Sequence, residues 1–219
     1  MSFKSKIRKL SRVSFFKTII LNFHYFGLHG VIHPKLIVSK NVVILGKKGM
    51  VNVKEGSKIF LGFGEIGFID QKRERMVWDV SGIINFSGDA AFCPGCRIVC
   101  LKNGIIEFGK DFSCNARTKI ICNKHIYFGN DCMISWDCTF IDTDFHRVLD
   151  LNNNRMNDDE DIFVQDHVWV CSETLVLKGA EIKQDSIIAA RSIVTKCLSK
   201  KNSIYVNNDI VKEGINWDK

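Results

Sequence analysis

The sequence predicts an all-β fold, a left-handed parallel β-helix of hexapeptide repeats with a short N-terminal helical arm and an excursion loop. The first observation is a six-residue period in which an aliphatic residue returns six times in succession: Val164, Val170, Val176, Ile182, Ile188 and Val194. The second is a small or β-branched residue four positions after each of the first five: Val168, Thr174, Ala180, Ser186 and Ser192. Neither helical periodicity nor strict alternation produces this pattern. The third is a polar stretch that interrupts the period without ending it.

A six-residue period has a direct structural meaning. Three short strands form one coil of a triangular prism, so that a coil takes about eighteen residues. The aliphatic side chain fills the interior, the small residue lies near a corner, and stacked coils continue one core. A right-handed β-solenoid and a sandwich of short strands are the alternatives, and six uninterrupted matches disfavour both.

The same register extends toward the N-terminus. It predicts interior positions at Phe86, Phe92, Ile98, Phe108, Cys114, Ile120, Phe128, Ile134 and Phe140, and small corner positions at Ala90, Cys96, Cys132 and Cys138. Val38 and Ile44 also fit, whereas residues 62–80 do not, and for these we expect an irregular hairpin or loop. Several of the nine cysteines are thereby interpreted as small apolar filler rather than as disulfide partners.

Length and composition favour a single domain. The chain has 219 residues, of which 46% are hydrophobic, and its two prolines leave no proline-rich linker. We expect an N-terminal helical arm or cap at 1–30, the β-helix domain at 31–205 and a C-terminal tail at 206–219. No secretory signal or membrane-spanning segment is convincing, because the apolar stretch 13–26 is broken by Lys17, Asn22 and His24. We therefore expect a cytoplasmic protein with free thiols.

The N-terminal arm is basic, within a chain of net charge +7. Its apolar residues recur at helical spacing, as in Phe15, Ile19 and Phe23. Such a helix is suited to peripheral contact with an anionic membrane at its inner face. Solenoids also require a cap on their open end, and we favour this second interpretation.

The excursion loop is predicted at 146–163, where the register stops after Phe145 and resumes at Val164. This polar insertion must loop out of the prism. Its first residue, His146, follows Asp142 and Asp144 closely. A histidine on a rigid rim suits a general base, and a neighbouring carboxylate can fix its tautomer.

The repeat region and the excursion together resemble the hexapeptide-repeat acyltransferases, in particular the galactoside, maltose and capsular-polysaccharide O-acetyltransferases. The resemblance lies in 128–146, which ends in Asp-Thr-Asp-Phe-His, and in 164–196, and it covers roughly 80–215. It implies a homotrimer that binds acetyl-CoA between neighbouring prisms and transfers the acetyl group directly to a sugar or glycan hydroxyl, in surface polysaccharide biosynthesis.

The resemblance also implies roles for individual residues. His146 is the catalytic base, with Asp142 and Asp144 beside it. The residues that match the CoA-binding positions are Trp169, Ser172, Ala190, Thr195 and Lys196. Those that match or replace acceptor-binding positions are Asn115, Arg117 and Trp136. Arg117 stands where the family has asparagine, which suggests an anionic acceptor, and Trp136 is placed to stack on a sugar ring.

Other functions compete with this one. A serine or nucleotide-sugar acetyltransferase is an alternative, although the first 40 residues are too few for the helical domain of the serine enzymes. A γ-type carbonic anhydrase would need three histidines per zinc, and only His125, His146 and His167 lie in the repeat region. A non-catalytic scaffold is the last alternative. We expect no metal and no nucleic-acid partner.

Overall fold

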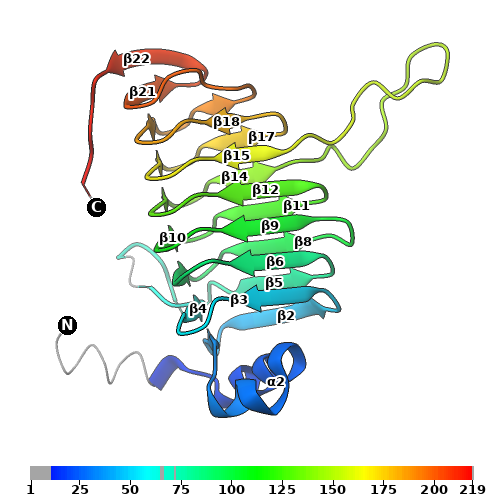
Figure 1. Cartoon of the computed structure of the whole chain (residues 1–219), viewed down its shortest axis with the longest axis vertical. Helices are drawn as coiled ribbons and strands as arrows, with labels where there is room; N and C mark the ends of the chain where they lie inside the picture. The colour runs from blue at the N-terminus through cyan, green and yellow to red at the C-terminus, as the bar shows by residue number, and fades with distance from the viewer. Residues whose placement is uncertain (1–10, 65–66, 72, 219) are drawn as a thin grey trace.

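The protein forms a triangular prism of parallel strands, shown in Figure 1. The computed structural model describes residues 11–64, 67–71 and 73–218. Among them, three sheets form the three faces, and each sheet takes every third strand of the chain, so one coil contributes one strand to each face. This is the arrangement that the six-residue period predicts, and it is the left-handed parallel β-helix.

The first sheet contains nine strands in spatial order: β1 (Leu36–Val38), β4 (Ile59–Leu61), β7 (Ala90–Phe92), β10 (Phe112–Cys114), β13 (Met133–Ile134), β16 (Trp169–Val170), β19 (Ile187–Ile188), β21 (Ser203–Val206) and β22 (Asp209–Glu213). All neighbours pair in parallel except β21 and β22, which are antiparallel.

The second sheet contains seven strands: β2 (Val42–Lys47), β5 (Met76–Val80), β8 (Arg97–Cys100), β11 (Lys119–Cys122), β14 (Thr139–Ile141), β17 (Leu175–Leu177) and β20 (Ile193–Val194). The third contains six: β3 (Met50–Val53), β6 (Ile83–Phe86), β9 (Ile105–Phe108), β12 (His125–Phe128), β15 (Ile162–Val164) and β18 (Glu181–Ile182). We call the edge between the first and second sheets corner 1, that between the second and third corner 2, and that between the third and first corner 3.

The interior is filled by the residues that the period selects. The six aliphatic residues from Val164 to Val194 have no exposed surface, and the small residues that follow them are at most 1% exposed. Toward the N-terminus the filler becomes aromatic, and Phe108 stacks between Phe86 and Phe128 with ring centroids 4.9 and 5.4 Å apart. The nine cysteines are all free, and six of them are buried. The prediction of an interior packed by repeat residues is confirmed.

Corners 1 and 3 turn through residues in the left-handed conformation. At corner 1 these include Arg117, Asp137, Glu173 and Arg191, with φ between 58° and 60°. This conformation is uncommon for residues other than glycine, asparagine and aspartate, so the stacked coil must hold it. The turns therefore place the same corner residue of each coil in a column along the prism.

The expectation of irregular structure across 62–80 is wrong at its C-terminal end. Residues 76–80 form β5, with Met76, Trp78 and Val80 buried and the residues between them half-buried. Only the preceding segment is an insertion at corner 1. It breaks the six-residue phase, which concealed the strand that follows.

The excursion leaves the prism earlier than the register indicates. β14 ends at Ile141 and β15 begins at Ile162, so the loop contains residues 142–161. Figure 1 shows it extending outward from corner 2. His146 is thus the fifth residue of the loop rather than the first.

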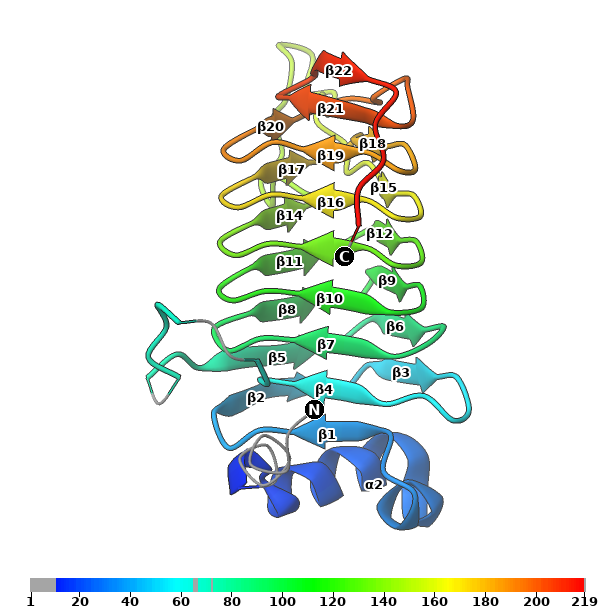
Figure 2. The ribbon, with the colours of Figure 1, turned by 90° about the vertical axis from the view of Figure 1, so that its left-hand side faces the viewer.

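The helix α2 (Phe15–Ile32) lies across the end of the prism, below β1, as Figures 1 and 2 show. The buried side chain of Asn22 attaches it there. Asn22 donates to the carbonyl of Leu36 (2.7 Å) and accepts from the backbone N–H groups of Lys35 and Leu36 (2.7 and 3.0 Å). The described residues contain no helix long and apolar enough to cross a membrane.

Candidate functional site

A pocket of about 520 Å³ opens at corner 2, where the excursion leaves the prism. Ile141, Leu177 and Lys178 contribute from the second sheet and its edge, Asp144 and Phe145 from the start of the loop, and Thr195 from the coil above. Two of the residues predicted for different roles, Asp144 as catalytic and Thr195 as CoA-binding, therefore line the same pocket. His146 follows Phe145 directly at its rim.

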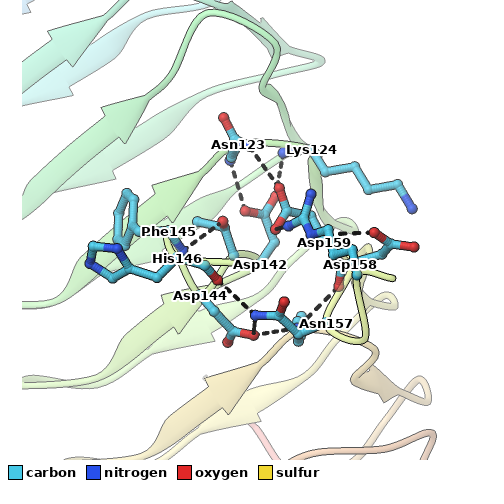
Figure 3. A network of polar contacts seen from close by, with 12 residues as sticks. Asn123, Lys124, Asp142, Asp144, Phe145, His146, Asn157, Asp158 and Asp159 are labelled. Carbon is cyan, nitrogen blue, oxygen red and sulfur yellow. Dashed lines mark hydrogen bonds and ion pairs between the residues drawn. The ribbon is translucent and has the colours of Figure 1, made fainter. Parts of the chain in front are cut away.

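Asp142 fixes the base of the excursion. Its side chain is fully buried, and its carboxylate accepts hydrogen bonds from the backbone N–H groups of Asn123 (2.7 Å) and Lys124 (2.9 Å) in the turn one coil below (Figure 3). Cys122 adds a thiol contact to the same carboxylate at 3.2 Å. The catalytic role predicted for Asp142 is therefore replaced by a structural one, because both carboxylate oxygens are engaged below the pocket.

Asp144 lies in the pocket and is bound on both sides. Its Oδ2 accepts from Lys178 Nζ at 2.5 Å and from Asn157 Nδ2 at 2.8 Å. The hydrogen bond from Lys178, followed by that from Asn157, holds the pKa of the Asp144 carboxyl below its usual range. Asp144 is thus an anion at neutral pH whose charge Lys178 balances.

The His146 imidazole is exposed and projects away from both aspartates (Figure 3). Among the described residues it makes no side-chain hydrogen bond or ion pair, so the expectation that Asp142 or Asp144 fixes its tautomer is wrong within one chain. The backbone holds it instead: the His146 N–H donates to the Asp144 carbonyl (2.6 Å), and Asn157 donates to the His146 carbonyl (2.8 Å). Phe145, with φ 60°, makes the turn that projects the ring outward.

Asn157 and Lys178 are the site residues that sequence reasoning missed. Asn157 stands near the far end of the excursion and links its two arms through Asp144 and His146. Lys178 comes from the corner of the next coil. No spacing rule could identify Asn157, because the path of a polar loop does not follow the hexapeptide period. Lys178 could be found, since it occupies the corner position above the loop.

Four of the other predicted residues form a second group along corner 1. Asn115, Trp136, Ser172 and Ala190 lie at this corner in successive coils, and backbone hydrogen bonds such as Arg191 N–H to Ser172 O (2.9 Å) connect the upper ones. We call these four residues the corner-1 column. The strands of the second sheet separate the column from the excursion pocket, so one chain does not bring the two groups together.

Arg117 is already neutralised by its neighbours. Its guanidinium binds both carboxylate oxygens of Asp137 (2.9 and 2.6 Å), and Glu74 lies 3.7 Å away. The hydrogen bonds that Arg117 donates to Asp137 raise the pKa of Arg117 above its usual value. The expectation that Arg117 marks an anionic acceptor loses its basis, since an incoming carboxylate would have to displace a bidentate partner.

Trp169 and Lys196 lie outside both groups. Trp169 is on the outer side of the first sheet, where its Nε1–H donates to Ser135 Oγ (3.0 Å) and its ring packs on Trp217. Lys196 is exposed next to Thr195. Within one chain Trp169 packs against Trp217 of the C-terminal tail, and its contact with CoA stays a prediction.

The described parts of the chain contain no candidate metal site. No group of three or more His, Cys, Asp or Glu side chains there could hold an ion. The three repeat-region histidines lie apart: His125 opens β12 and contacts Glu107 (3.0 Å), His146 is in the excursion, and His167 is at corner 3 against Asp185 (3.0 Å).

The chain is similar to sugar acetyltransferases in sequence and in fold. No family model matches it. It is 29% identical over 112 residues to the galactoside O-acetyltransferase of Lactococcus lactis subsp. lactis (strain IL1403), a match that covers 51% of this chain and 54% of that protein. The match thus spans about half the length of that relative.

Among solved structures, the polySia-specific acetyltransferase NeuO superposes with a TM-score of 0.66 at 21% identity, covering 84% of this chain and 76% of that one. The polysialic acid O-acetyltransferase OatWY aligns with a TM-score of 0.49 at 18% identity, over 81% and 91% of the two chains. The repeat and the prism, together with the likeness to NeuO, show the left-handed parallel β-helix fold, and part of the chain is similar in sequence to a galactoside O-acetyltransferase.

Proposed function

We propose that the protein is a CoA-dependent O-acetyltransferase that transfers an acetyl group from acetyl-CoA to a sugar hydroxyl in surface polysaccharide biosynthesis. The observation that carries the proposal is the excursion pocket. There an exposed imidazole at the rim adjoins a cavity whose lining includes Asp144 and Thr195. The similarity to a galactoside O-acetyltransferase supports the reaction class.

His146 performs the proton transfer in this reaction. Its neutral imidazole accepts the proton of an acceptor hydroxyl, the oxygen attacks the thioester carbon of acetyl-CoA, and the CoA thiolate leaves and is protonated. The pocket suits the donor, because Ile141 and Leu177 supply apolar surface and Thr195 and Lys178 supply hydrogen-bond donors. The Asp144–Lys178 pair fixes the lysine, and Asn157 holds the loop that carries the imidazole.

The proposal includes a homotrimer with sites shared between subunits. The excursion pocket and the corner-1 column lie at opposite ends of the second-sheet strands, and the five residue steps from Trp136 to Ile141 span at most about 16 Å, at 3.3 Å per fully extended residue. A neighbouring prism can bring its own corner 1 against the excursion of the first. In such a ring each site combines His146 of one subunit with Ser172 and Ala190 of the next.

The acceptor is a sugar or glycan, with Asn115 and Trp136 as the residues proposed to contact it. We place the enzyme in the cytoplasm, at the inner face of the membrane, with no nucleic-acid partner. Trp136 supports the sugar assignment because its ring is partly exposed and lies edge-to-face with Phe68, at 5.3 Å between centroids. A partly exposed aromatic surface of this kind suits the apolar face of a sugar ring.

The activity is tested by following thiol release from acetyl-CoA with a panel of sugars, nucleotide sugars and glycolipids. The shared site is tested by complementation. His146→Ala removes the base, and Ser172→Trp blocks the column. If neighbouring subunits build each site, refolding the two inactive variants together should restore about a quarter of wild-type activity, because one site in four then carries neither change.

The matched control mixes His146→Ala with Thr195→Trp. Thr195 lines the excursion pocket of the subunit that supplies His146. This mixture should regain no activity, because every site that contains an intact His146 then has a blocked pocket. Restored activity in the control, or none in the first mixture despite mixed trimers, would contradict the shared site. No thiol release with any acceptor would contradict the transferase itself.

A further inference from the structure

The helix α2 presents an apolar face to solvent. Phe15, Phe16, Ile19 and Phe23 are between 49% and 74% exposed. At 100° per residue they occupy one side of the helix, while Thr18, Leu21 and Asn22, which are buried against the prism, occupy the other. An outward-facing row of phenylalanines is unusual for a surface helix, because its burial would be favourable.

The face continues past the kink at Gly27, where φ is 63°. Leu28 and Ile32 are 73% and 71% exposed. Figures 1 and 2 show α2 running across the end of the prism, at the opposite end from β21 and β22. The exposed apolar surface therefore covers the blunt end of the molecule rather than one of its sheets.

Charge is distributed unevenly between the two ends. Of the 31 Lys and Arg and 24 Asp and Glu in the chain, residues 1–54 contain eleven Lys and Arg and no Asp or Glu. The remaining 165 residues therefore contain 20 basic and 24 acidic residues and are net negative. Seven of these eleven basic residues lie among the described residues 11–54, so the helical end is cationic, whereas the remaining 165 residues are net negative.

A second pocket, of about 380 Å³, adjoins α2 at the edge of the lowest coils. Its lining includes His24 from the helix, Lys48 from the first coil and Lys102 from a higher one, together with the exposed side chain of Met50. No Asp or Glu is among the lining residues. Cationic groups of this kind can bind a phosphate. The apolar residues beside them suit a ligand that has both an anionic group and an apolar part.

We propose that α2 and this pocket form a docking surface for an anionic lipid bilayer. The phenylalanines enter the boundary between headgroups and acyl chains, and Lys48 and Lys102 approach lipid phosphates, so that the prism stands on the membrane by its helical end. Interfacial helices bind through apolar area and attraction to anionic lipid together, and both are present here. A second copy of this chain is a poor occupant because two cationic ends repel each other.

The inference does not depend on acetyl transfer, and vesicle sedimentation tests it directly. The full chain is mixed with vesicles of phosphatidylglycerol and phosphatidylethanolamine, or of phosphatidylcholine alone. We expect binding to the anionic vesicles, little to the neutral ones, and a fall in binding as salt is raised, because lysine–phosphate attraction is screened.

Two variants and one control separate the apolar and electrostatic contributions. Phe16→Ser with Phe23→Ser, and Lys48→Glu with Lys102→Glu, should each weaken vesicle binding roughly tenfold or more. Val211→Ser removes a comparably exposed apolar residue from β22 at the far end and should bind like wild type. All three should keep the wild-type melting temperature, and acetyl transfer to a soluble sugar should be unaffected.

Equal binding to neutral and anionic vesicles would overturn the proposal, as would a double phenylalanine variant that binds like wild type. A third outcome would assign the face to self-association instead. In that case the protein would not bind vesicles, and its mass in light scattering would fall when Phe16 and Phe23 are replaced. If none of these proteins, wild type included, transfers an acetyl group, the proposed function is refuted and the membrane result still stands.

Discussion

His146 combines an exposed ring with a backbone held by hydrogen bonds on both of its peptide groups. The Asp144 carbonyl and the Asn157 amide hold its peptide groups, while the imidazole projects into solvent without a side-chain partner among the described residues. The ring can therefore adopt the tautomer and rotamer that an incoming hydroxyl requires. Neither of the two aspartates before it orients the ring within one chain, so under the proposed function the bound substrates would set its orientation.

Replacing His146 tests its role as the base. His146→Ala should lower kcat by roughly 10²–10⁴ and leave CoA affinity nearly unchanged, because general-base catalysis acts as the transition state forms. The wild-type rate should also fall in acid as the imidazole is protonated. Steady-state kinetics from pH 5 to 9 measures both effects, with His33→Ala, an exposed histidine outside the site, as the control. A variant that retains more than a tenth of wild-type kcat would return His146 to an ordinary loop residue.

The Asp144–Lys178 pair links stability to pH. Because the folded state lowers the pKa of Asp144, its contribution is present above the unfolded value, near 3.9, and is lost as pH falls through the lowered folded value. Lys178→Met removes the main cause of that shift. The variant should therefore be less stable than wild type at neutral pH, and the difference should shrink toward pH 3. Urea midpoints across this range measure it, with Lys119→Met, exposed on β11, as the control. A stability difference between Lys178→Met and wild type that stays constant with pH would exclude a link between the Asp144 pKa and stability.

At the scale of the strands and coils, stability depends on continuous packing along the interior. Phe108 lies between Phe86 and Phe128 and meets Phe92 edge-on, with ring centroids 5.2 Å apart. Interruption of this column opens a cavity that touches three coils, since each coil buries its residues only against its neighbours. The column should therefore matter more than any single strand pairing.

Phe108→Ala should lower the free energy of unfolding by about 3–5 kcal/mol, the usual cost of truncating a fully buried aromatic residue. Phe163→Ala provides the matched control, because Phe163 projects outward from β15 and is 37% exposed. Its loss should cost much less. Urea denaturation of both variants decides the question, and similar costs would show that the column is not the main source of stability.

The C-terminal segment closes over the first sheet. After β22 the chain descends along this face (Figure 2), and Trp217 stacks on His167 with centroids 4.2 Å apart while its Nε1–H donates to the His167 carbonyl (3.0 Å). Trp217→Ala should release the tail and speed tryptic cleavage after Lys212 roughly 30-fold, since an aromatic stack and a hydrogen bond of about 1 kcal/mol each are lost together. Trp217→Phe, which keeps the ring, should have a smaller effect. Unchanged cleavage would mean that other contacts hold the tail.

The period explains which elements the sequence could predict. From Val164 to Val194 every coil is regular, so interior and corner residues follow directly from spacing. β5 was missed because the corner-1 insertion shifts the phase before Met76. The position of Trp217 was missed because a single stacked ring leaves no pattern. The candidate site divides in the same way: Asp144 and His146 are predicted from the break in the period and Thr195 from the resemblance, whereas the contacts of Asn157 depend on the path of an irregular loop.

At the scale of the whole molecule, the helical end and the excursion lie at different heights along one axis. Four coil steps separate β2 from β14, which at about 4.8 Å per step raises the excursion roughly 20 Å above the first coil. If α2 rests on a membrane, the proposed site faces the polar part of a lipid-linked glycan rather than its lipid. The cationic helical end and the position of the pocket are thus both consistent with one orientation of the enzyme on a membrane.

Ligand binding should stabilise the assembly as a unit. If acetyl-CoA occupies a groove shared by neighbouring subunits, it binds only the folded trimer, and at 100 times its dissociation constant it contributes about 2.7 kcal/mol. The melting temperature should then rise with CoA concentration and, because unfolding dissociates the trimer, with protein concentration as well. Ser172→Trp should abolish the CoA-dependent rise and keep the dependence on protein concentration, whereas His146→Ala should keep both. Differential scanning calorimetry at several concentrations of each measures these effects, with light scattering to give the mass. A monomer whose melting temperature ignores both concentrations would exclude the shared groove, and a CoA effect that survives Ser172→Trp would place the donor away from corner 1.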